Sequence, residues 1–234
     1  MIIDMRNYGL ELGYWVKAFK PFVDYSSQNA LMKIQQDFED GCDNHPKFRW
    51  ETKKPIRSIM ADAYDSPGKH VDRVCFTWAF HADFTKGDKP KKNPLWSVSE
   101  MVTQVEVFAL DPEERKVLHF HQDLKHKAQL GPHVHMQISE DFLNAGNGIK
   151  LGVPRFPGAA ILPTDCLDLV LSEFFPEKWP MEQVGLQGIG TLRQAQRSRF
   201  ERLAAALHQE WLALPARTPV ARTQNCFMPT IQLA

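Results

Sequence analysis

The sequence predicts an α+β protein, in which an antiparallel sheet of four or five strands carries a helical N-terminal cap and has C-terminal helices packed on one face. Apolar residues recur at helical spacing up to about residue 45 and again after about residue 163. Between about residues 71 and 139 they alternate in steps of two, as in strands with one buried face. Helices that flank a run of strands are typical of α+β proteins, whereas α/β proteins alternate the two elements.

We expect one domain over residues 1–234, because 43% hydrophobic residues suffice for a core of this size. Its expected parts are a helical cap (1–65), the sheet (71–140), a loop and helix (141–190), a long helix (191–214) and an irregular tail (215–234).

Composition excludes several function classes. The 28 basic and 28 acidic residues balance, so no overall positive field favours non-specific binding of nucleic acid. The start lacks the features of a signal peptide and no stretch approaches membrane-spanning length, so we expect a cytoplasmic protein without membrane contact. The four cysteines are far apart, which predicts reduced thiols and argues against a zinc ribbon or a disulfide scaffold.

Two helices are expected in the cap. The first follows the apolar spacing from Tyr14 to Val23, and the second begins at a Ser26 or Ser27 N-cap and stops at Gly41. Turn signals then predict irregular structure up to Lys69.

The first strand of the expected sheet alternates from Val74 to His81, and the lysine-rich loop Lys86–Pro94 follows it. A solvated loop is the main interpretation of these lysines, and a loop that grips phosphate is the alternative. The next strand, Met101–Leu110, ends at a turn with Pro112 in its second position.

Histidines gather on the next two predicted strands. Alternate side chains of a strand share a face, so His119, His121 and Asp123 lie on one side of the strand Val117–Asp123. His133 and His135 share a face of the strand His133–Ser139 in the same way. Because the opposite faces of both strands are apolar and need the core, pairing brings the four imidazoles together.

The turn at Pro112 also predicts a register. If Leu110 pairs with Arg115, Glu106 lies opposite His119 and Gln104 lies opposite His121.

After residue 139 the chain offers one further candidate for the site. Arg155 lies between two prolines in a predicted stiff loop and could neutralise an anion over the sheet. Thr164 is expected to cap a helix that ends before Pro176, and Thr191 is expected to open the long helix with a capping box.

Four arginines cluster in the first half of that long helix. We interpret them as a solvated face or, as the alternative, a docking surface for an acidic protein or nucleic acid. They are Arg193, Arg197, Arg199 and Arg202.

One interpretation of the histidines is a metal site. Imidazoles two residues apart on a strand, with a third ligand from the neighbouring strand, suit zinc or another divalent metal. Asp123, Glu106 or Asp83 would orient a ligand or act as a general base on metal-bound water. The candidate ligands are His119, His121, His133 and His135.

A second interpretation needs no metal, because two facing histidines can act as base and acid in cleaving a phosphodiester. The string His133–Ser139 resembles the His-x-His-x-Gln string of the nucleotidyltransferase branch of the histidine-triad superfamily. The resemblance covers seven residues and implies a nucleotide substrate with His135 as the nucleophile.

The third interpretation is structural, with neutral histidines bonded to Glu106, Gln104 or the backbone. The sequence therefore favours a hydrolase or transferase acting on a phosphoester of a nucleotide or RNA. The site would be the four histidines with Glu106, Asp123 and Arg155. The alternative is a non-catalytic subunit of a larger cytoplasmic assembly that binds a protein or nucleic acid through the arginine cluster.

Overall fold

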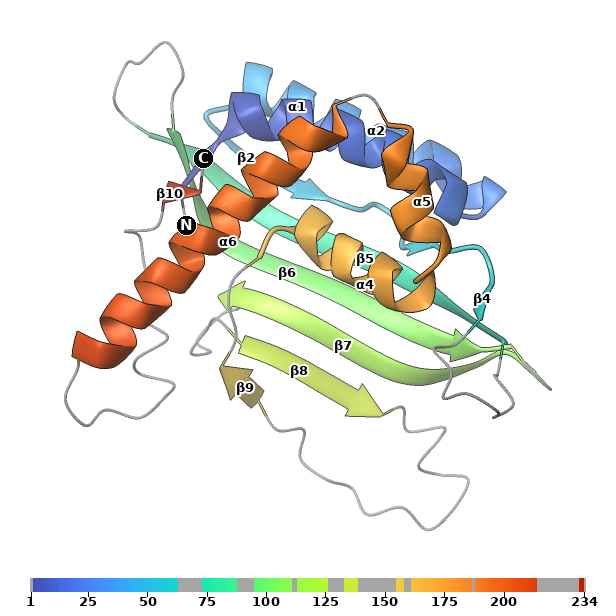
Figure 1. The fold of residues 1–234 in the computed structure, drawn as a ribbon. Coiled ribbons are helices and arrows are strands. Elements are labelled where there is room, and N and C mark those ends of the chain that lie inside the picture. The colour runs from blue at the N-terminus through green and yellow to red at the C-terminus, as the bar shows by residue number, and fades with distance from the viewer. Residues whose placement is uncertain are drawn as a thin grey trace.

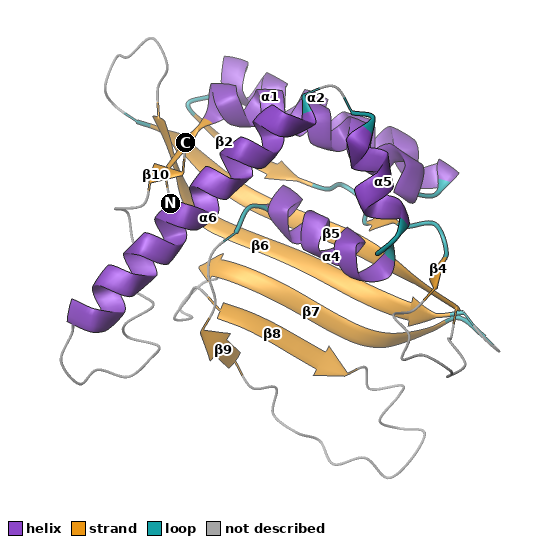
Figure 2. Ribbon diagram, viewed as in Figure 1, coloured by secondary structure: helices purple, strands orange, loops and turns teal. Residues whose placement is uncertain are grey.

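The computed structural model describes residues 2–62, 73–87, 95–110, 113–125, 133–138, 155–157, 161–186, 188–213 and 232–233. It confirms the predicted α+β class. The helices α1, α2, α4, α5 and α6 form a layer over one face of a curved sheet, and the opposite face carries no helix among the described residues (Figure 1). Figure 2 shows the same two layers by type of secondary structure. No helix within the described ranges is both long and apolar enough to cross a membrane.

The N-terminal helices are α1 (Met5–Phe19) and α2 (Tyr25–Asn44), joined by the short 3-10 helix η1 (Lys20–Phe22). Aspartates cap both helices: the carboxylate of Asp4 accepts from the backbone N–H of Arg6, and that of Asp24 accepts from the backbone N–H of Ser27. The predicted N-cap at Ser26 or Ser27 is therefore wrong by two or three positions. The second helix also continues one turn beyond its predicted end at Gly41.

Within the described residues the sheet has ten strands, of which five are at least five residues long and correspond to the predicted four or five. They are β2 (Lys47–Glu51), β5 (Arg73–Lys86), β6 (Leu95–Ala109), β7 (Arg115–Lys125) and β8 (His133–Ile138).

Five shorter strands extend the sheet. They are β1 (Ile2–Asp4), β3 (Ile56–Arg57), β4 (Ala61–Asp62), β9 (Arg155–Pro157) and β10 (Gln232–Leu233).

The main path of the sheet runs β5, β6, β7, β8, β9, with every neighbouring pair antiparallel. The strands β2, β3 and β4 line the outer edge of β5, while β1 extends β6 and pairs in parallel with β10. The sheet thus begins well before residue 71, and the expectation of irregular structure between residues 43 and 69 is wrong for β2, β3 and β4. A signal was present, because Phe48 and Trp50 alternate with charged residues in β2.

Three C-terminal helices complete the layer: α4 (Pro163–Phe174), α5 (Lys178–Val184) and α6 (Ile189–Ala213). The predicted caps are displaced, because Pro163 already lies inside α4 and α6 begins before Thr191. Gly188 precedes α6 with φ of +88°, a conformation that favours glycine. A Cβ atom at this position would lie 2.5 Å from the ring of Tyr14, so only glycine fits here.

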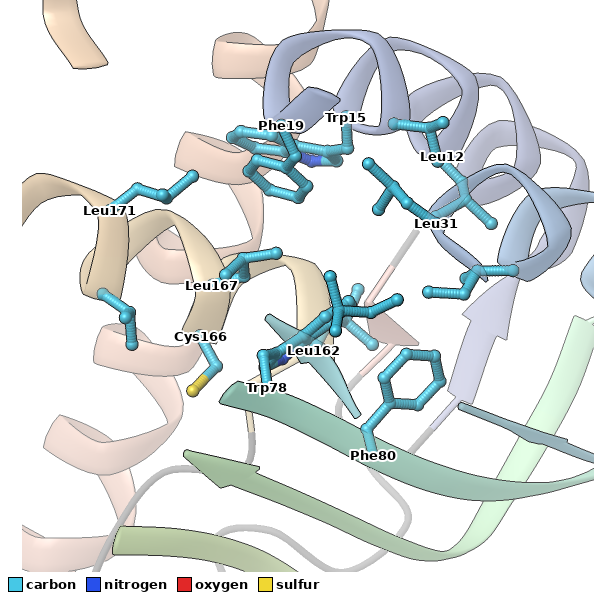
Figure 3. Close-up of a cluster of buried hydrophobic side chains, with 14 of the residues drawn as sticks. Leu12, Trp15, Phe19, Leu31, Trp78, Phe80, Leu162, Cys166, Leu167 and Leu171 are labelled. Atoms are coloured by element: carbon cyan, nitrogen blue, oxygen red, sulfur yellow. The ribbon is translucent and has the colours of Figure 1, made fainter. Parts of the chain in front are cut away.

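The core lies between the helical layer and the sheet. Figure 3 shows Trp15 and Phe19 of α1 facing the side chains of Leu167 and Leu171 on α4, with Trp78 of β5 below them. These residues belong to one cluster of buried side chains to which α1, α2, α4, α5 and α6 all contribute. Cys42, Cys75 and Cys166 are free thiols, as predicted, and Cys226 lies outside the described residues.

Candidate metal centre

Strand pairing brings two histidines face to face. In the β7–β8 pair His121 lies directly opposite His135, and His119 lies opposite Gln137. In the β6–β7 pair Glu106 lies opposite His119 and Gln104 lies opposite His121, so the predicted register is confirmed at these positions. Directly opposed residues of an antiparallel pair project from the same face, and His121 and His135 therefore share one surface.

The turn between β6 and β7 was expected to set this register by pairing Leu110 with Arg115, but the structure shows a different pairing. Arg115 pairs with Ala109 and not with Leu110, and Val107 pairs with Leu118. The intervening Val117 is an extra residue on β7, and this β-bulge shifts the pairing by one position. The bulge compensates for the different turn and restores the predicted opposition of Glu106 and His119.

Three potential metal ligands converge on this face: His121, Asp123 and His135. One ligand atom from each lies within 4.8 Å of the other two. The Oδ2 atom of Asp123 is 3.5 Å from Nε2 of His121 and 3.9 Å from Nε2 of His135. The two imidazole rings lie 4.1 Å apart between centroids.

The distances between these donor atoms would suit a single metal ion if the donors moved slightly closer together. Donors bound to zinc at about 2.0 to 2.1 Å with tetrahedral angles are about 3.3 Å apart. The two separations from Asp123 exceed this value by well under 1 Å, a difference that side-chain rotation can remove.

The centre is sheltered although it lies on the face away from the helices. The alternate residues of β5 that face the helices, such as Phe76 and Trp78, are buried in the core, while Thr77 and Ala79 on the other face are half-buried. The side chain of Asp123 is only 4% exposed, those of His135 and His121 11% and 23%. A carboxylate this buried next to two imidazoles is typical of a ligand site and uncommon on an open sheet surface.

His119 is near this centre but outside the converging group. Its ring centroid is 5.3 Å from that of His121, and its Nε2 atom is buried without a hydrogen-bond partner among the described residues. Burial lowers the pKa of His119 below the ordinary value for histidine, against the opposing effect of the Glu106 carboxylate. Glu106 itself accepts a hydrogen bond from Nζ of Lys116 at 3.0 Å.

Two further predicted site residues are described by their backbones. His133 pairs with Asp123 in the β7–β8 ladder, and Arg155 pairs with His135 in the β8–β9 ladder. The positions of their side chains lie outside what the structure describes. The segment around Arg155 was expected to be a stiff loop, and this is corrected to the short strand β9, which forms the edge of the sheet.

A histidine elsewhere on the same face has a different setting. His81 of β5 is opposite Val102, and its Nε2 atom is 3.1 Å from Oε1 of Glu100. It does not belong to the converging group, so it offers a control for experiments on the other histidines.

The expected arginine face on α6 is wrong for Arg193 and Arg199. Arg199 is buried and makes ion pairs with Glu11 and Asp165 at 2.6 and 2.8 Å. Arg193 is half-buried and binds Asp168 at 2.6 Å. Of the four arginines, Arg197 and Arg202 are exposed, and Arg197 pairs with Glu201 on its own helix.

Two of the four residues of the expected docking surface therefore bind the protein's own helices. A solvated or partner-binding role is excluded for Arg199 by its burial, because its guanidinium already contacts two carboxylates.

The donor set restricts the possible metals. Two imidazoles and one carboxylate are ligands for zinc and for other divalent transition metals such as iron, whereas calcium and magnesium prefer oxygen ligands alone. Three protein ligands also leave at least one coordination position for water or a substrate, as in catalytic sites.

Comparisons with known proteins give no family, since no family model, no curated protein and no solved structure matches the chain.

Proposed function

We propose that the protein binds one divalent transition metal ion, preferably zinc, through His121, Asp123 and His135. The single observation that carries this proposal is the convergence of three donor atoms from two adjacent strands within 4.8 Å. The ligands lie on paired strands of a sheet backed by a packed core, so their backbone positions are fixed before the metal arrives.

We further propose that the bound metal serves hydrolysis or transfer at a phosphoester of a nucleotide or RNA. A metal with an open position lowers the pKa of bound water, and so provides a nucleophile at neutral pH. Two residues support the phosphoester as substrate. The backbone of Arg155 pairs with that of the ligand His135, and the ring of His119 lies beside that of the ligand His121.

Metal-free cleavage of a phosphodiester is the second candidate. The observation that favours it is the close approach of the His121 and His135 rings, 4.1 Å between centroids, because base and acid can then act on the same phosphate. The two candidates differ in one respect that is easily measured: chelation abolishes metal-dependent activity and leaves metal-free activity intact.

The test starts with protein purified without chelator, in which bound metals are quantified by mass spectrometry. Apo protein is then titrated with Zn²⁺, Co²⁺ and Fe²⁺, and hydrolysis of bis(p-nitrophenyl) phosphate and of a short RNA is followed with each metal and in EDTA. We expect one metal ion per chain and hydrolysis that EDTA abolishes. If none of the three metals binds at one ion per chain, the proposal of a metal site is contradicted. Binding of Fe²⁺ without hydrolysis retains the metal site and overturns the hydrolytic role.

His81→Ala serves as the matched control, because His81 lies on the same sheet face and is paired with Glu100. Its metal binding and activity are expected to equal those of the wild type.

A further inference from the structure

A buried nitrogen atom beside the candidate metal centre has no hydrogen-bond partner among the residues that the structure describes. It is Nε2 of His119, and the ring that carries it is half-buried. Buried polar atoms in native proteins almost always form hydrogen bonds, because an unpaired one costs free energy. The nitrogen therefore calls for a small polar partner.

The position of His119 restricts where such a partner would lie. His119 is two residues from His121 on β7, so its side chain projects from the sheet face that carries the metal ligands. The two rings are 5.3 Å apart between centroids. His119 does not belong to the group of donor atoms that lie within 4.8 Å of one another. It is therefore placed to contact a group bound to the ion, and not the ion itself.

Two charged groups that act on His119 are bound to each other. Glu106 lies opposite His119 on β6, and its carboxylate accepts a hydrogen bond from Nζ of Lys116 at 3.0 Å. This ion pair leaves the Nε2 atom of His119 unbonded. Lys116 also neutralises the charge of Glu106, so that the carboxylate does not repel an anion at the centre.

The charge of a loaded centre favours an anion as the partner. The two charges of a divalent ion exceed the single negative charge of Asp123, and imidazole ligands are neutral when they bind a metal. The open position of the ion would therefore attract a negatively charged group. An imidazole N–H near that position can stabilise such a group by a charge-assisted hydrogen bond.

We propose that His119 donates a hydrogen bond from Nε2 to an oxyanion bound in the open position of the metal, and that it is not a metal ligand. The expected ligand is a small oxyanion such as inorganic phosphate, the group that a phosphoester substrate also carries. The inference rests on the metal site proposed above and gives His119 the role of holding the bound anion.

Spectroscopy of the cobalt-loaded full chain tests this role, because the visible spectrum of bound Co²⁺ responds both to binding of the ion and to an anion that joins it. Apo protein is titrated with Co²⁺, free ion is removed, and inorganic phosphate is then added. His119→Ala is expected to keep the cobalt affinity within about threefold and to weaken phosphate binding about tenfold or more. His119→Gln, whose amide also donates a hydrogen bond, is expected to recover most of the phosphate affinity.

His81→Ala is the matched control, because His81 lies on the same sheet face and is paired with Glu100. It is expected to equal the wild type in both titrations. Wild-type phosphate affinity in His119→Ala, or no response of the wild-type cobalt spectrum to phosphate, would overturn the role of His119 and keep the metal site.

Two further outcomes separate His119 from the metal site. A loss of cobalt affinity in His119→Ala as large as that in His121→Ala would show that His119 is a metal ligand, and would overturn the proposal. If the wild type binds no cobalt, the metal site itself is contradicted, and the role of His119 with it.

Discussion

Two clusters of ionisable residues in this protein differ in composition and in role. One joins the helices: Arg199 binds Glu11 of α1 and Asp165 of α4, and Arg193 binds Asp168 of α4. The other lies on the sheet face away from the helices, where His121, Asp123 and His135 converge. The first pairs permanent cations with carboxylates, and the second brings three lone-pair donors toward one point.

The helical cluster satisfies its members within the protein. The amide of Gln196 donates to Asp165 and Asp168, and the indole of Trp179 also donates to Asp168. Such a network fixes the position of α6 on its neighbours, and nothing in it calls for a ligand. The difference teaches that a cluster of charged residues does not by itself indicate a ligand-binding site. Such a site is indicated when several donor atoms converge on one point, as the ligands of a metal ion do.

The largest expected effect comes from removing the central cation of the helical cluster. Arg199→Met leaves two buried carboxylates without their partner and is expected to lower the free energy of unfolding by about 3 to 5 kcal/mol. Urea unfolding of the metal-free protein measures this. Arg197→Met is the control: Arg197 is 73% exposed on the same helix, and its loss should cost less than about 0.5 kcal/mol. Equal losses in the two variants would show that the network does not hold α6.

The next effect concerns the sheet cluster, where substitutions should affect binding more than folding. His121→Ala and His135→Ala are each expected to weaken zinc affinity about 100-fold or more, equivalent to about 2.7 kcal/mol. The thermal midpoint of the apo protein should stay within a few degrees. Competition with a chromophoric chelator measures the affinity, and His81→Ala is the control. A large loss of stability with unchanged zinc affinity would assign the histidines a structural role.

A smaller effect is expected where the chain enters α6. Gly188→Ala meets both the positive φ and the ring of Tyr14, so the variant is expected to lose about 1 to 3 kcal/mol. Gly190→Ala is the control, because a Cβ atom there has no neighbour within 4 Å. Zinc affinity should be unchanged in both variants. If Gly188→Ala is as stable as the wild type, this junction does not constrain α6.

The smallest effect is a pH dependence of the helical cluster. Burial raises the pKa of Glu11 and of Asp165, and the Arg199 guanidinium offsets this only in part. A carboxyl whose pKa is raised on folding stabilises the fold below its unfolded pKa, about 4.3 for glutamate, and loses that contribution as pH rises through the folded value. The wild type should therefore lose stability relative to Glu11→Gln as the pH rises above about 4.

Urea unfolding at several pH values compares the two proteins, with Glu201→Gln as a control at an exposed glutamate. Parallel profiles for wild type and Glu11→Gln would contradict the raised pKa of Glu11.

The sequence was informative where one physical constraint dominated. Alternation from Leu118 to Asp123 and from His133 to Ile138 determined which residues share a face, because each strand has one apolar side that needs the core. It could not separate the ligands from their neighbours: His119 and His121 have the same parity, and only the pairing of His121 with His135 distinguishes them.

The sequence interpretation failed where tertiary contacts decide. Arg199 was assigned to a solvated face because arginines are usually exposed. A signal was available, since Leu192, Gln196 and Arg199 lie at helical spacing on one face of α6, and all three are buried. Their partners Glu11 and Asp165 are more than 30 residues away in sequence, and no local pattern relates them to α6.

The central claim, that His121 and His135 bind one metal ion with Asp123, can be tested at the level of single nitrogen atoms. Histidine side-chain ¹⁵N NMR of the apo protein during zinc addition, assigned with His→Ala variants, reports which ring nitrogens bind. We expect the Nε2 resonances of His121 and His135 to shift together at one equivalent of zinc, while those of His81 and His45 stay in place. Unshifted resonances of His121 and His135 at stoichiometric zinc would contradict it.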